Sequence, residues 1–422
     1  MVNTLARLPG QRLLVNAGAL ALIALVTLVA LPSFPGSPFG SRTKDAHPSD
    51  YERDMAAYDA HLREAARDEA STPTSELRYR RALLVGDTVA LTDLASTLST
   101  AGRADSVLSL RVDLALHRLG GAMARLNGLS GAADSTAFEL LRAQVLLQLG
   151  QTAEASEVFA RVIGTKKHWE AFAGLAAIEA GYGHYARADQ LYEQAADELD
   201  AKQMRAYSWV LLQRGLLRLR QGNAVEALQF YGQAEKAYSG SWLVDDYTAE
   251  ALAAAGRHEE AIARYRKAIA TSPRPELQQA LGDLYLYMGK PDLAARWLDA
   301  AHTAYSDSVA RGEPHYLHHL ARFHADSRLD AAKAVSLAQR DLELRDIAAT
   351  HDMLAWALYR DSQFESARHA LAPALASGVR DADLFLHAAL VELALGDASQ
   401  GRYWLQQAAA VNPRNGAFHV HR

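Results

Sequence analysis

The sequence predicts an all-α fold, a solenoid of antiparallel helix pairs preceded by a single N-terminal apolar helix. Three observations support this prediction. Small and large residues recur with a period of about 34 residues, as in helical repeat proteins. Apolar residues follow the i, i+3, i+4 and i+7 spacing of amphipathic helices, and alternating strand patterns are scarce. Because one helix pair cannot bury its own apolar face, neighbouring pairs must stack to form a core.

The repeat is most regular between Leu211 and Pro291, where the turn glycines Gly222, Gly256 and Gly289 recur at a nearly constant interval. Glycine suits the residue after a helix because it adopts left-handed backbone angles at little cost. Small residues recur inside the helices, where they let two helices approach to about 8–10 Å, and one large residue per unit fills the gap toward the next unit. These positions are Gly215, Ala249 and Gly282 on first helices, Ala227, Ala261 and Ala294 on second helices, and Tyr231, Tyr265 and Leu298 as the large residues.

Less regular copies extend the pattern over residues 133–415. The order of small and aromatic residues resembles the tetratricopeptide repeat (TPR), a helix–turn–helix unit of about 34 residues. The run from Asp352 to Tyr359 is similar to the first helix of bacterial TPR units, which suggests a member of the bacterial envelope type. The resemblance implies a right-handed superhelix whose concave face, lined by first helices, binds peptides or partner proteins.

The N-terminal region predicts a membrane connection. Residues 1–12 are basic, residues 13–31 contain no charge, and residues 32–48 are rich in Pro, Gly and Ser, as in an extended linker. The length of the uncharged run falls within the range of roughly 17–25 residues that a helix needs to cross a bilayer. We therefore expect a transmembrane signal anchor with residues 1–12 in the cytoplasm and the repeats outside it, periplasmic or at the cell surface. The alternatives are a cleaved signal peptide, which would give a secreted protein, and a buried helix.

Two further segments flank the regular repeats. Residues 49–132 read as a divergent helical capping region, and residues 416–422 as a C-terminal tail. The glycines between residues 120 and 131 predict a loop there. The interval from Ala294 to its counterpart Ala334 is longer than the usual repeat, which predicts a longer second helix or a bulged loop at residues 301–312.

The amino-acid composition excludes several classes of function. The chain has no cysteine, which excludes disulfides, thiolate metal sites and cysteine nucleophiles. A net charge of −5 and a pI near 6.3 give no global basic field, so no nucleic-acid partner is expected. We find no phosphate-binding glycine loop and no nucleophile elbow. The chain is therefore predicted to be no enzyme and to need no cofactor.

The resemblance places a partner-binding groove along the first helices. Its predicted residues are Asp246, Glu250, Glu276, Gln279, Asp283, His315, His318, Arg322, Asp352, Trp356 and Tyr359. The Lys and Asn clamp that such repeats use for a C-terminal carboxylate is missing. Four carboxylates in two adjacent units favour a basic or amide-rich segment, although acidic residues also simply solvate an exposed face.

A histidine cluster suggests a second hypothesis. His315 and His319 are four residues apart, which places both imidazoles on one helical face, a spacing that can share a metal ion. Tyr316 and Leu317 stand where a metalloprotease helix has its general-base glutamate, and neutral histidines at helix contacts are the commoner arrangement. No metal site is therefore assigned.

The sequence leads to one main functional hypothesis. The chain is expected to be a membrane-tethered, non-catalytic scaffold that binds an unidentified protein or peptide in its groove, in envelope assembly or secretion. The alternative is a metal- or pH-responsive accessory protein of a membrane transporter that uses the histidines between residues 315 and 324.

Overall fold

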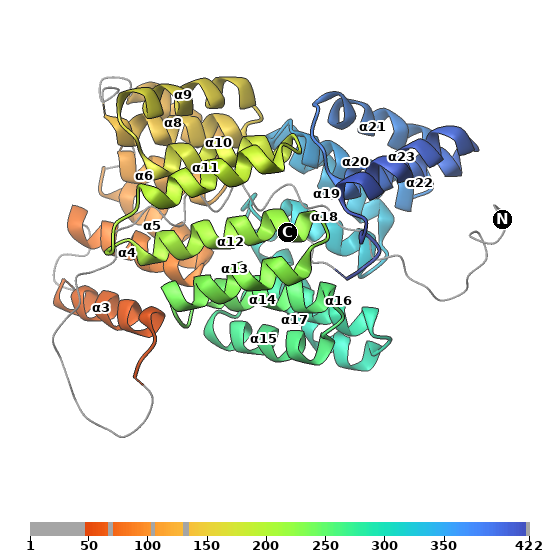
Figure 1. The fold of residues 1–422 in the computed structure, drawn as a ribbon. Coiled ribbons are helices and arrows are strands. Elements are labelled where there is room, and N and C mark those ends of the chain that lie inside the picture. Colours follow the sequence, from red (N-terminus) through yellow and green to blue (C-terminus); the bar gives the residue numbers. More distant parts are fainter. Residues whose placement is uncertain (1–46, 66–70, 103–105, 130–134, 419–422) are drawn as a thin grey trace.

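The computed structural model describes residues 47–65, 71–102, 106–129 and 135–418 (Figure 1). In these residues the chain forms 21 α-helices and no strand, which confirms the all-α prediction. None of these helices combines the length and the apolar character needed to cross a bilayer. The apolar helix predicted at residues 13–31 lies outside the described residues.

After α3 (Asp50–Glu64), the helices alternate as the first and second members of antiparallel pairs. The first helices are α4 (Thr72–Val85), α6 (Val107–Ala115), α8 (Thr136–Gln148), α10 (Trp169–Gly181), α12 (Met204–Arg220), α14 (Trp242–Ala254), α16 (Pro275–Tyr287), α18 (Leu317–Asp326), α20 (Ala348–Arg360) and α22 (Ala382–Ala394). The second helices are α5 (Thr88–Thr100), α7 (Leu119–Gly128), α9 (Thr152–Thr165), α11 (Tyr185–Asp197), α13 (Ala224–Ala237), α15 (His258–Thr271), α17 (Pro291–Ala310), α19 (Ala331–Leu344), α21 (Phe364–Ala376) and α23 (Ala398–Val411).

Close packing inside each pair follows the small residues of the repeat. Ala227, Ala261 and Ala294 are fully buried. A Cβ added at Gly282 would lie 2.6 Å from Leu298 Cδ2, so a larger residue at this position would require Leu298 on α17 to shift. The ring of Tyr231 packs on that of Tyr247 in the following pair, with centroids 5.6 Å apart. These contacts confirm the predicted roles of the small and large positions.

Two local predictions have different outcomes. The extra residues after Ala294 lengthen a second helix, because α17 has 20 residues, and this confirms one of the two expected solutions. The loop predicted at residues 120–131 is wrong in its first part, because α7 is helical to Gly128. Burial of Leu119, Ala122 and Leu126 offsets the cost of a glycine in a helix, about 0.5–1 kcal/mol.

The array winds so tightly that its second half, from α13 to the end of the described chain, lies against its first half, α3 to α12 and the turn after it (Figure 1). Hydrogen bonds join residues that are far apart in the chain: Trp242 Nε1 donates to Leu84 O at 3.0 Å, Ser272 Oγ donates to Val85 O at 2.7 Å, and Arg380 N donates to Gly181 O at 2.9 Å. At the N-terminal end, Tyr51 N donates to Ser239 O at 3.1 Å. We call this line of contacts between the two halves the seam.

Turn glycines of the first half have a second role at the seam. Gly150 has a φ of 79°, and a Cβ there would lie 2.8 Å from Ile347 Cγ2 and 2.9 Å from Asp346 O. Gly256 has the same left-handed conformation, with a φ of 78°, but a Cβ there would meet no atom within 4 Å. Two reasons therefore require glycine at position 150: its left-handed backbone angle and the close approach of the second half. At Gly256 only the backbone angle requires it.

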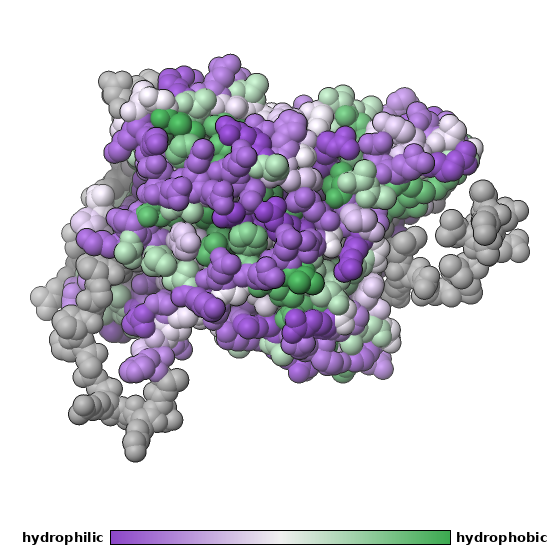
Figure 2. Space-filling view, in the orientation of Figure 1, coloured by the Kyte–Doolittle hydropathy of each residue, from purple (hydrophilic) through white to green (hydrophobic). Residues whose placement is uncertain are grey.

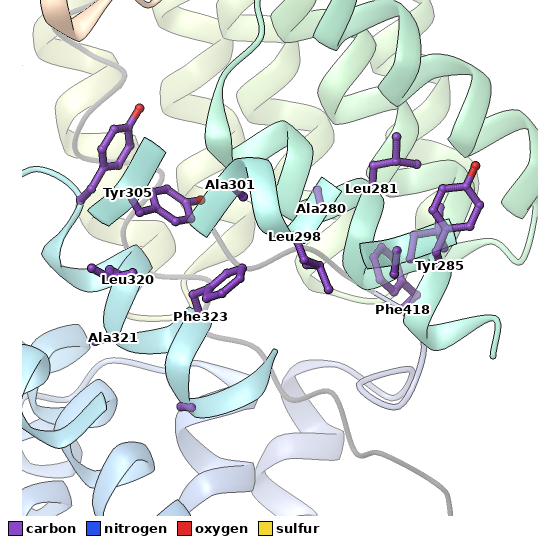
Figure 3. Packing of buried hydrophobic residues seen from close by; sticks show 14 of the residues in the cluster. Ala280, Leu281, Tyr285, Leu298, Ala301, Tyr305, Leu320, Ala321, Phe323 and Phe418 are labelled. Carbon is purple, nitrogen blue, oxygen red and sulfur yellow. The ribbon is translucent and has the colours of Figure 1, made fainter. Parts of the chain in front are cut away.

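The segment after α23 continues the seam without a helix. It crosses from α23 to the end of α12, where Asn412 Oδ1 would lie 2.6 Å from a Cβ at Gly222. Phe418 is buried beside α16, with its ring 5.5 Å from that of Tyr287 (Figure 3). An apolar anchor thus fixes the described end of the chain to a helix pair from a much earlier part of the sequence.

A pair of matched substitutions separates the two roles of the glycines. Gly256→Ala should cost about 1–2 kcal/mol of unfolding free energy, the penalty for left-handed backbone angles. Gly150→Ala should cost about 1–3 kcal/mol more, because the methyl group overpacks the seam. Urea unfolding of both variants measures the difference, and equal losses would show that the seam does not press on Gly150.

Candidate functional site

The predicted groove residues line an interior. Nine of them are buried: Asp246, Glu250, Gln279, Asp283, His315, His318, Arg322, Asp352 and Trp356. Glu276 and Tyr359 are partly buried. All except His315, which lies in the turn before α18, are on first helices, as the repeat predicts. The structure therefore brings these residues together, but in a closed interior where an open groove was expected.

Further polar residues share this interior and were missed at the level of sequence. They include Gln144, Gln148, Glu170, Gln213, Asp326, Asp383 and His387, all buried and all on first helices. One pattern could have identified two of them. Asp383 and His387 have the same four-residue spacing as Asp352 and Trp356, which places each pair on one face of its helix.

Hydrogen bonds join neighbouring first helices through these side chains. Trp356 Nε1 donates to Asp326 Oδ1 at 2.8 Å, which connects α20 to α18. His387 Nδ1 lies 2.7 Å from Asp352 Oδ1, which connects α22 to α20, and the His387 ring stacks on Trp356 at 4.4 Å. Since an unpaired polar group costs about 1–3 kcal/mol when buried, these bonds offset part of the cost of the polar interior, in which other buried atoms such as those of the Gln148 and Gln213 amides have no hydrogen-bond partner in the described part of the chain.

Carboxylates in the interior have perturbed acidities. The pKa of Asp283 is raised to about 7 mainly by burial; the hydroxyl of Ser327, which donates to Asp283 Oδ1 at 3.0 Å, opposes the shift, and the charge of Asp326 adds to it. Burial likewise raises the pKa of Asp326, against the opposing charge of Arg322. The interior thus holds two carboxyl groups with raised pKa values, of which Asp283 changes charge near neutral pH.

The histidines gather where the two halves meet at α18. Burial lowers the pKa of His315 and His319 to about 4 each, and that of His117, from the first half, to about 3. His318 Nδ1 lies 3.1 Å from Asp341 Oδ2, and Asp341 also accepts hydrogen bonds from Arg345. At neutral pH these histidines are therefore neutral packing residues.

The histidine cluster does not form a recognisable metal centre. In the part of the chain that the structure describes, no three His, Asp or Glu side chains are grouped so that they could hold one metal ion. His319 stacks on Tyr305 with centroids 5.8 Å apart, and the His315 ring lies 4.1 Å from that of Tyr316. These contacts are the helix-packing arrangement that the sequence also allowed.

Comparisons with known proteins add little to this geometry. No family model matches the chain, and none of the curated proteins does. Among solved structures it is similar to the APC/C hetero-tetramer Cut9–Hcn1, with 16% identity over 88% of this chain and 76% of that chain and a TM-score of 0.45. It is also similar to yeast Tom70 (13% identity, 85% of this chain, 92% of that chain, TM-score 0.37) and to a tetratricopeptide repeat protein from Parabacteroides merdae (16%, 58%, 93%, 0.36). At these values the similarities say nothing of activity or partners.

The raised pKa of Asp283 gives a testable pH dependence. The folded chain holds this proton up to a pKa of about 7, whereas an unfolded aspartate releases it near pH ~3.9. The stabilisation from the proton is therefore complete below the unfolded pKa and is lost as pH rises through the folded pKa. Between pH 5.5 and 8.5 this group should remove about 2 kcal/mol of unfolding free energy.

Asp283→Asn should abolish this loss, because the amide cannot ionise. Urea unfolding of wild type and variant at both pH values measures it, with Asp93→Asn on the exposed side of α5 as the matched control. If the wild type and Asp283→Asn changed in parallel with pH, Asp283 would not be the titrating group.

Proposed function

We propose that this chain is a non-catalytic scaffold that binds a protein partner. The support comes from its construction, an array of helix pairs in which every pair adds surface and the polar residues of the first helices are buried in the interior. The face shown in Figure 2 is mostly hydrophilic, with small, separate hydrophobic patches. Partner binding therefore depends on particular exposed sites.

The best supported of these sites is the outer face of the last pair, α22 and α23. Leu405 occupies the repeat position of Tyr231 and Tyr265, which are both 0% exposed because the following pair covers them. In the described chain no pair follows α23, and Leu405 is 37% exposed. Leu393 and Tyr403 are exposed on the same pair. This is the observation that carries the proposal.

The partner that fits this face is an amphipathic helix. At the junction between α13 and α14, the large residue of the second helix packs against the first helix of the next pair, as the contact of Tyr231 with Tyr247 shows. A partner helix placed against Leu405 would repeat this junction between two proteins. Apolar anchors in such contacts contribute most of the binding energy.

The membrane connection remains part of the proposal. The uncharged run at residues 13–31 supports a tether, with the repeats on the extracytoplasmic side, and a role in envelope assembly or secretion would follow from that location. Recognition by the predicted groove residues is a second route, but it requires the two halves to separate, since residues such as Trp356 and Asp283 are buried.

Introducing a charge on the last pair tests the proposal. Leu405→Glu should abolish capture of the partner from a membrane extract of the source cells, because it places a carboxylate in an apolar contact. The melting temperature should stay close to that of the wild type, since Leu405 is already exposed. Cross-linking followed by mass spectrometry should place the partner on α22 and α23.

Val225→Glu is the matched control, because Val225 is an isolated exposed apolar residue on α13, 64% exposed. This variant should retain the partner. Equal capture by both variants would contradict binding at the last pair, and loss of the partner only in Trp356→Ala, in a folded protein, would favour the interior instead.

A further inference from the structure

A cleft of about 460 Å³ opens in the seam between two of its contacts. Its lining includes Gly150 and Ile347, which meet at one of these contacts, and Gly181 and Arg380, where Arg380 N donates to Gly181 O. One wall comes from the ends of α8 and α10 in the first half, and the other from the start of α20 and the turn between α21 and α22 in the second half. The cleft thus lies between two segments that are distant in the sequence.

The walls of the cleft are mainly apolar. The first half contributes Leu147, Ala177, Ile178 and Tyr182, and the second half contributes Ile347, Ala348, Ala349, Pro373 and Val379. A volume in the range of about 300–1,000 Å³ with apolar walls and few polar groups is typical of sites for small organic molecules. The walls therefore fit an apolar body larger than a simple ion.

Two arginines supply the charge of the cleft. Arg220 lies at the boundary between this cleft and a smaller cavity of about 80 Å³, and Arg380 also lines both. Among the described residues, neither guanidinium is within 4.0 Å of a carboxylate oxygen, and Arg220 Nη2 is buried without a hydrogen-bond partner. Arg380 Nη2 donates only to the amide oxygen of Gln407, at 3.3 Å. Both cations therefore lack a bound counterion.

One acidic residue of the cleft, Asp381, interacts electrostatically with Arg220, but no carboxylate oxygen of the cleft lies within 4.0 Å of either guanidinium. Asp381 accepts the amides of Asp383 and Leu384 at the start of α22, at 2.9 and 3.1 Å. Asp346 is exposed and pairs with His351 at 2.7 Å, and Glu154 is exposed on α9. Burial raises the pKa of Asp381 to about 6 and the charge of Arg220 opposes the shift, so Asp381 is mostly ionised at neutral pH. Because it forms no direct ion pair with either guanidinium, a ligand anion would supply the first direct charged contact that the two arginines have in the cleft.

We propose that this cleft binds a small amphipathic organic acid, with its carboxylate on Arg220 and Arg380 and its apolar body between Ile178 and Val379. A guanidinium suits this role because its planar donors match a carboxylate. The ligand contacts both halves of the chain, so it stabilises the closed superhelix by mass action. The cleft does not include Leu393, Tyr403 or Leu405, so this proposal does not depend on the proposed partner.

Calorimetric titration of the full chain with 4-phenylbutyrate tests the proposal, with the uncharged 4-phenylbutyramide as the paired probe. The acid should bind one site per chain and raise the melting temperature, and the amide should bind at least ~10-fold more weakly, which is about 1.4 kcal/mol. Arg220→Gln should weaken binding of the acid by a similar factor. Arg187→Gln, on the exposed side of α11, should leave it unchanged.

Ala177→Leu tests the position independently of charge, because the larger side chain fills part of the cleft. It should weaken both probes while the unliganded melting temperature stays close to the wild-type value. Absence of binding at millimolar concentrations would overturn the proposal. So would equal affinity for acid and amide, or full binding by both Arg220→Gln and Ala177→Leu.

Discussion

Contact between the two halves of the superhelix determines the rest of this structure. In an open solenoid each pair touches only its neighbours, and the inner face is a surface. Here the turn at Gly150 meets Ile347 and the turn at Gly181 meets Arg380, so the inner face becomes an interior. Once the halves touch, polar side chains on the inner face lose contact with water, so the hydrogen-bond partners that they have are other side chains of the interior.

That requirement explains the polar character of the interior. If every first helix carried aliphatic residues on its inner face, more apolar area would be buried. Apolar contacts are not directional, however, so they would not fix the rotation angle between successive helix pairs. A bond such as that between Trp356 and Asp326 exists only at one relative position of α18 and α20. Burying a carboxylate or imidazole without a hydrogen-bond partner is costly. A superhelix with a different rotation between pairs would break these hydrogen bonds and would therefore be less stable. The raised pKa of Asp283 measures part of the cost of this arrangement.

The structure within each helix pair could be predicted from the sequence, but the contact between the two halves of the superhelix could not. The helix pairs, the turn glycines and the tight alanine positions follow from spacing, because each depends on residues within one unit, as at Gly282 and Leu298. The predicted inner-face residues, except His315, do lie on first helices. Their burial depends on the summed rotation of several successive pairs, and small differences in each pair decide whether Gly150 reaches Ile347. No short pattern encodes that sum.

Closure also changes how the array responds to ligands and stress. A nearest-neighbour solenoid loses its end units independently, whereas contacts between residues far apart in the chain make the first and second halves unfold together. Such non-local contacts raise the contact order, which slows folding. A molecule that occupies the seam touches both halves at one point, yet it acts on the winding of all the pairs between them. The seam is therefore the place where a small binding energy has the largest structural effect.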